Sequence, residues 1–148
     1  MKKIIKFRVY PESIHGFYFE VGIYPNIERM RAAAKRNGGK TSNFENAGAV
    51  TCGFRVGHID AGESKIRWTK QLGLIAFNRC EIDAEIVAHE STHAAIRWME
   101  EKRVPFDIGK SALVEDKGGM AHDTEERFCY AVGKITNQIV DEWIARDK

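Results

Sequence analysis

The sequence has few cysteines, and their arrangement excludes two common kinds of site. The three cysteines are widely spaced and contain no C-x-x-C pair: Cys52, Cys80 and Cys129. An odd set of this kind predicts neither a disulfide framework nor a cysteine zinc site. We expect three reduced, mostly buried thiols in a protein from a reducing compartment.

Long apolar runs and a strong charge imbalance are also missing. No stretch approaches the roughly 18 apolar residues of a membrane-spanning helix, and Lys6 and Arg8 interrupt the first apolar run too early for a signal peptide. Lys and Arg number 23 against 21 Asp and Glu, so a formal net charge of +2 predicts no nucleic-acid partner and no membrane partner. The expected protein is soluble and cytoplasmic, and its oligomeric state stays open.

The chain has 148 residues, of which 43% are hydrophobic and 30% charged, as in an ordinary globular protein. This length predicts a single domain spanning residues 1–148. Apolar alternation and β-branched or aromatic clusters predict strands over residues 3–10, 15–24, 49–59, 66–69 and 73–77. Helical spacing and end signals predict helices over residues 26–36, 82–102 and 124–145, with loops over residues 40–46 and 104–120.

Most strands precede the two long helices, and this order predicts an α+β fold. In the last helix, apolar residues recur at the spacing of one helical face: Phe128, Val132, Ile135, Ile139 and Trp143. That face is expected to pack on the rest of the domain. The expected architecture is a small twisted sheet packed on the first long helix, with the C-terminal helix beside it.

The strongest chemical signal is an H-E-x-x-H motif inside the predicted helix 82–102. His89 and His93 are four residues apart, so both imidazoles lie on one helical face and can bind one metal ion. Glu90 lies about 100° further round the helix, where its carboxylate can take a proton from a zinc-activated water. The alternative is a surface helix that carries two unrelated histidines.

A catalytic zinc site needs a third protein ligand and one open position. The metzincin motif is excluded, because Met99 stands where its third histidine belongs and Ile96 replaces its glycine. The remaining candidates for the third ligand lie in or just before the last helix: Glu125, Glu126 and His122. Glu126 shares a helical face with Tyr130 and Gly133, and we expect this face to meet the H-E-x-x-H helix, because glycine allows a close approach.

The segments Val87–Ala95 and Glu125–Gly133 together resemble the small zincin-like metallopeptidases of phages and prophages. More distantly, the pattern is similar to the ImmA/IrrE peptidases, although it lacks the residues usual after their glutamate helix. The resemblance covers about residues 82–135 and implies a gluzincin-type zinc site. It implies His89, His93 and Glu126 as zinc ligands and Glu90 as the general base.

These observations predict a zinc metallopeptidase that hydrolyses peptide bonds of a peptide or protein substrate. Tyr130 is a candidate catalytic residue that polarises the substrate carbonyl, with a core tyrosine as the alternative. By analogy with the fold, residues 73–77 are expected to form an edge strand that holds an extended peptide. Two other classes stay open: a catalytically silent zinc-binding protein of phage type that binds a host factor, and a structural protein whose histidines bind nothing.

Overall fold

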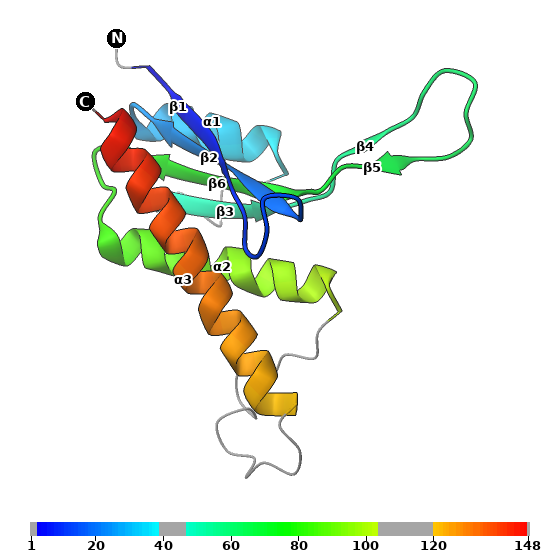
Figure 1. Ribbon diagram of the computed structural model, residues 1–148. Coiled ribbons are helices and arrows are strands. Elements are labelled where there is room, and N and C mark those ends of the chain that lie inside the picture. Colours follow the sequence, from blue (N-terminus) through cyan, green and yellow to red (C-terminus); the bar gives the residue numbers. More distant parts are fainter. Residues whose placement is uncertain (1–2, 39–46, 104–119, 148) are drawn as a thin grey trace.

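A four-stranded mixed sheet lies at the centre of the computed structural model, which describes residues 3–38, 47–103 and 120–147 (Figure 1). The sheet has the strand order β1-β2-β6-β3. Its strands are β1 (Ile5–Val9), β2 (Tyr18–Tyr24), β3 (Ala49–Gly53) and β6 (Gln71–Asn78). β1 pairs with β2 and β3 pairs with β6 in antiparallel fashion, whereas the central pair β2 and β6 is parallel.

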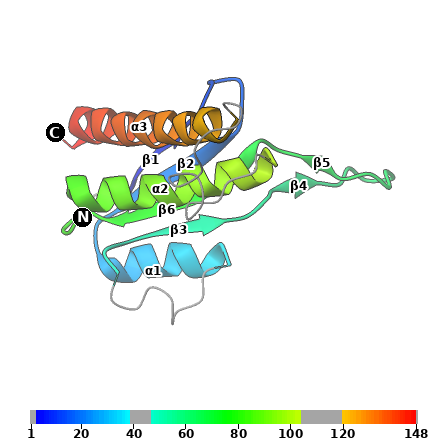
Figure 2. The same cartoon turned by 90° about the horizontal axis from the view of Figure 1, so that it is seen from below.

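Three helices cover the two faces of this sheet, as Figure 2 shows. Helix α1 (Ile27–Arg36) packs on one face, and α2 (Ala84–Glu101) and α3 (Met120–Arg146) pack on the other. Since the sheet is covered on both faces, β6 buries seven of its eight residues instead of alternating between buried and exposed positions. This architecture confirms the predicted α+β class, with a small sheet packed on the H-E-x-x-H helix and the C-terminal helix beside it.

The hydrophobic core divides according to the two faces of the sheet. On β6, Ile75 and Phe77 pack into the larger cluster with α2 and α3, whereas Leu74 and Ala76 pack with Met30 of α1. This division follows from the period of two along a strand. The predicted apolar stripe of α3 belongs to the larger cluster, where Ile135 and Ile139 are fully buried and the other members pack against them.

The predicted strand 49–59 is divided between two sheets. Its first half is β3, and its second half is β4 (Gly57–His58), which pairs with β5 (Arg67–Trp68) in a two-stranded arm that projects from the main sheet (Figure 1). A Cβ atom on Gly57 would lie 2.5 Å from Ile66 Cγ2, so glycine at this position allows the two halves of the arm to approach closely.

Arg55 fixes the base of this arm to the body of the molecule. Its guanidinium lies 5.4 Å from the centre of the Phe17 ring and 5.7 Å from that of Trp68. It also donates to the Thr69 carbonyl oxygen and forms an ion pair with Glu101 of α2. Arg55 therefore connects the two-stranded arm to helix α2.

The structure corrects three expectations. Residues 73–77 do not form an edge strand, because β6 lies between β2 and β3; the edge beside β6 is β3. The last helix begins at Met120 and not near residue 124. Only Cys52 is buried, whereas Cys80 and Cys129 are exposed, and all three thiols are free.

The predicted loops 40–46 and 104–120 fall almost wholly outside the described residues. Among the helices of the described part of the chain, none is long and apolar enough to cross a membrane.

Candidate metal centre

Helix α2, which carries the H-E-x-x-H motif, begins at a well-defined cap. The Asp83 side chain accepts a hydrogen bond from the Ile86 backbone N–H at 2.8 Å, and Glu85 adds a negative charge to the first turn. Both features stabilise the N-terminus of a helix. The apolar side of α2, including Val87, Ala94 and Trp98, packs into the larger core cluster. The motif therefore lies on a helix that both its cap and its packing hold in place.

His89 and His93 lie together on the side of α2 that faces away from this core. Both residues are exposed, their ring centres are 4.8 Å apart, and their Nε2 atoms are 3.1 Å apart. Two unprotonated imidazole nitrogens at this distance repel each other unless a proton or a cation lies between them. The predicted convergence of the two imidazoles is thus present in the structure.

The spacing of the two nitrogens fits zinc. With Zn–N bonds of about 2.0–2.1 Å, tetrahedral coordination places two ligand nitrogens about 3.3 Å apart. The observed 3.1 Å is close to this value. Neutral imidazole is also a preferred zinc ligand. The geometry of the two histidines would therefore allow them to serve as two of the three protein ligands of a zinc ion.

Glu90 points to a different neighbour, the edge strand β3. The residue is only 6% exposed, and its Oε2 atom accepts a hydrogen bond of 2.5 Å from the hydroxyl of Thr51. The same hydroxyl lies 3.3 Å from the Glu90 backbone carbonyl oxygen. A buried carboxylate is costly unless it is hydrogen-bonded, so Thr51 both stabilises Glu90 and fixes its orientation.

The negative charge of this carboxylate affects the thiol of Cys52, which follows Thr51 on β3. Burial raises the pKa of the Cys52 thiol above its ordinary value, and the negative charge of Glu90 raises it further. Both effects disfavour the thiolate. In these surroundings Cys52 is held as the neutral thiol and packs in the core.

The face of α3 that carries Glu126 is not the one that packs on the sheet and α2. Within the described part of the chain, a Cβ atom added to Gly133 would have no neighbour within 4 Å, so neither α1 nor α2 approaches this glycine. Helix packing instead uses the face of Ala131 and Ile135, which are 1% and 0% exposed. The expectation that the face of Glu126, Tyr130 and Gly133 meets α2 is therefore wrong, because the apolar stripe decides how the helix packs.

The third ligand stays a prediction. Glu126 and Glu125 are both exposed near the start of α3. Within residues 3–38, 47–103 and 120–147, no three His, Cys, Asp or Glu side chains form a group that could hold a metal ion. His122 lies in α3, but its side chain is outside the described part of the structure. The structure thus brings His89 and His93 together and leaves Glu126 apart from them.

Tyr130 is 73% exposed, so it is not the core tyrosine that was the alternative to its catalytic role. It lines a cleft with Trp98, Arg127 and Lys134, and neither Glu90 nor the two histidines belong to that lining. A role of Tyr130 in polarising a carbonyl stays a prediction.

Nothing in the sequence marks Thr51 as part of the site. Its residue type and its place in a predicted strand carried no signal of a contact with Glu90, 39 positions later in the chain. Only the packing of α2 against β3 brings the two side chains together.

Comparison of the chain with protein-family models, curated proteins and solved structures gives no match. The geometry of the site and the H-E-x-x-H motif therefore carry the functional inference.

Proposed function

We propose that the protein is a zinc-dependent metallopeptidase with its active site on α2. The observation that carries the proposal is the 3.1 Å distance between the Nε2 atoms of His89 and His93. These two residues and Glu126 are the proposed zinc ligands. Glu126 is exposed on α3, which packs against α2 through another face, so Glu126 would have to move toward the two histidines to complete the site.

The chemistry divides between the metal and the chain. Zinc, when bound, supplies Lewis acidity to the scissile carbonyl and lowers the pKa of water. Glu90 takes a proton from the attacking water and passes it to the leaving amine. The hydrogen bond from Thr51 holds the Glu90 carboxylate in one orientation, and β3, the edge strand beside α2, is the surface on which an extended peptide substrate pairs.

A second candidate function is a zinc-binding interaction protein without hydrolytic activity. The specific observation in its favour is the environment of Glu90, whose carboxylate is buried and already hydrogen-bonded to Thr51. A carboxylate held in this way can serve as a structural tie between α2 and the sheet. We further propose a cytoplasmic location, in keeping with three free thiols, two of which are exposed.

The test measures zinc content and hydrolysis in the same preparations. Purified wild-type protein and its Glu90→Gln and His93→Gln variants are analysed for zinc and incubated with a mixture of unstructured peptides, whose products are identified by mass spectrometry. The metallopeptidase predicts about one zinc per chain and cleavage in the wild type. It predicts zinc without cleavage for Glu90→Gln and neither for His93→Gln.

Each other outcome has a definite meaning. Zinc without cleavage in the wild type supports the interaction protein, and cleavage that persists in Glu90→Gln contradicts the general-base assignment. A matched control is His58→Gln, which removes an exposed histidine on β4, away from α2. If His58→Gln loses zinc as His93→Gln does, the site on α2 is wrong.

A further inference from the structure

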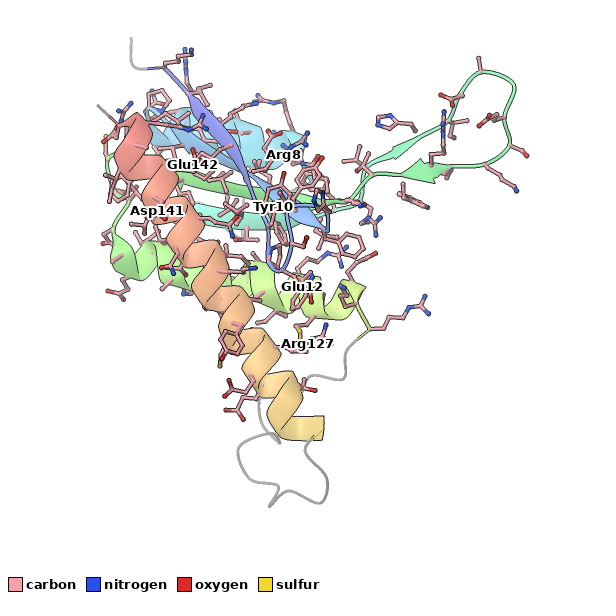
Figure 3. The ribbon with its side chains drawn as sticks, viewed as in Figure 1. Arg8, Tyr10, Glu12, Arg127, Asp141 and Glu142 are labelled. Carbon is pink, nitrogen blue, oxygen red and sulfur yellow. The ribbon has the colours of Figure 1, made fainter. Side chains whose placement is uncertain are left out.

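A cleft apart from the two histidines lies where the β1–β2 loop meets α2 and α3. It has a volume of about 300 Å³. Its lining comes from three segments that are distant in sequence, and we call it the cationic cleft: Pro11, Glu12, Trp98, Arg127, Tyr130 and Lys134. Figure 3 shows Glu12 of the loop and Arg127 of α3 on the same side of the molecule, near the C-terminal end of α2.

The walls of the cationic cleft are largely aromatic and apolar. Trp98 is 2% exposed, so its ring is a fixed wall, whereas Tyr130 is 73% exposed and stands at the rim. Pro11 completes the apolar part. A site of this kind takes the apolar body of a small ligand, and its volume is at the lower end of the range for small-molecule sites.

The polar part of the cleft has an excess of positive charge. The Arg127 guanidinium lies 5.6 Å from the centre of the Trp98 ring, and the Lys102 ammonium lies 5.9 Å from it. Lys134 donates to the backbone carbonyl oxygen of Glu12. Of the described residues that line the cleft, only Glu12 is acidic, and its carboxylate is paired with Lys102 at 3.1 Å.

Among the described residues, Arg127 and Lys134 of the lining have no carboxylate partner, whereas Lys102, beside the cleft, pairs with Glu12. Within the part of the chain that the structure describes, neither Arg127 nor Lys134 forms a salt bridge. Positive charges in a cleft with apolar walls attract an anion more strongly than they would on an open surface. The guanidinium of Arg127 can also bind a carboxylate through two parallel hydrogen bonds.

We propose that the cationic cleft binds a carboxylate carried on an apolar group. The carboxylate pairs with Arg127 and Lys134, and the apolar group packs on Trp98 and Tyr130. Two sources share this chemistry: the C-terminal residue of a peptide and a small aromatic or aliphatic acid. The cleft does not include His89, His93 or Glu90, and binding there needs no zinc. The proposal can therefore be tested independently of the proposed metallopeptidase activity.

Binding is measured by calorimetry and by backbone and indole NMR shifts of the full chain. The probes are 3-phenylpropionate and N-acetyl-alanyl-phenylalanine, each compared with its own amide, and acetate. Both free acids are expected to bind and to shift the Trp98 indole signal, with each amide at least tenfold weaker. The tighter of the two acids identifies the source. Equal binding of acid and amide overturns the proposal, and acetate binding as tightly as the aromatic acids means an adventitious ion only.

Substitutions then test the residues. The double variant Arg127→Gln with Lys134→Gln is expected to weaken the acids at least tenfold and to leave the amides unchanged. Lys35→Gln with Arg36→Gln is the matched control, since it removes two exposed charges from α1 on the opposite face of the sheet. Arg127→Lys, a milder change, keeps the charge but loses the two-pronged hydrogen bonding, so it should weaken binding by a smaller factor. Unchanged affinity in the double variant overturns the proposal.

Discussion

The hydroxyl of Thr51 donates a hydrogen bond of 2.5 Å to the carboxylate of Glu90, and this contact ties the edge strand β3 to the helix that carries the H-E-x-x-H motif. This hydrogen bond is expected to affect both the stability of the protein and the chemistry of Glu90. A buried carboxylate that loses its donor is destabilised, and a general base that loses its donor is no longer held in position.

The first prediction concerns this hydrogen bond. Thr51→Val keeps the β-branched shape but leaves Glu90 without its donor, so the free energy of unfolding should fall by about 1–3 kcal/mol. Urea denaturation measures the change. Thr51→Ser keeps the hydroxyl and should lose much less stability than Thr51→Val. Equal stability of Thr51→Val and the wild type would show that the contact contributes nothing.

The second prediction concerns the third zinc ligand. Glu126→Gln should lower zinc affinity at least about tenfold, since even the hydrogen-bond partners of metal ligands change affinity by about 10–100-fold. Glu125→Gln is the matched control on the same turn of α3 and should bind zinc as the wild type does. Competition with a chromogenic chelator measures both. The reverse order would move the assignment to Glu125, and no effect of either change would leave His122 as the candidate.

The third prediction uses two glycines in opposite surroundings. Gly133→Ala should raise the free energy of unfolding by about 1 kcal/mol, because alanine favours the helix and its Cβ has open space around it. Gly73→Ala should lower it by roughly 1–3 kcal/mol or more, because the new Cβ would lie 2.1 Å from the backbone oxygen of Cys52. A loss of stability in Gly133→Ala would mean that a helix does pack against this face.

The fourth prediction concerns the thiols. At pH 8, Cys80 and Cys129 should react rapidly with Ellman's reagent, whereas Cys52 should react only after unfolding, because it is buried and its pKa is raised. Cys52→Ala should therefore leave the rapid phase unchanged and remove the slow one. Three rapid thiols in the folded wild type would contradict the burial of Cys52.

The raised pKa values also set a direction for stability in alkali. Burial raises the pKa of Cys52 above 9.0 and that of Tyr24 above 10.0, so the folded protein holds these protons more tightly than the unfolded chain does. The corresponding stability is complete below about pH 9 and is lost as the pH rises through the folded-state values. Denaturation midpoints between pH 8 and pH 11 should fall, and less steeply in Cys52→Ala.

Local sequence signals located most of the helices and strands, although the predicted strand 49–59 is divided into β3 and β4 and the last helix begins earlier than predicted. Asn26 and Asp83 cap α1 and α2, and the side chain of each accepts a hydrogen bond from a backbone N–H three residues later, as is common for Asn and Asp. The apolar stripe of α3 predicted its buried face. The spacing of His89 and His93 likewise predicted their convergence, because four residues make about one helical turn. All of these features lie within one helix and its flanking residues, so they can be predicted without knowing how the elements pack together.

Tertiary structure decided what no single element could. The order of the strands placed β6 inside the sheet and β3 at its edge, so the expected edge strand was wrong. The α3 stripe, not the glycine at position 133, determined how the helix packs, because burying large apolar side chains stabilises a contact more than a close approach at one glycine does. The hydrogen bond from Thr51 to Glu90 and the contact of Arg127 with the Trp98 ring form only because segments distant in sequence pack together. Periodicity determines which face of an element is apolar, whereas the partner of each polar side chain depends on where the other elements pack.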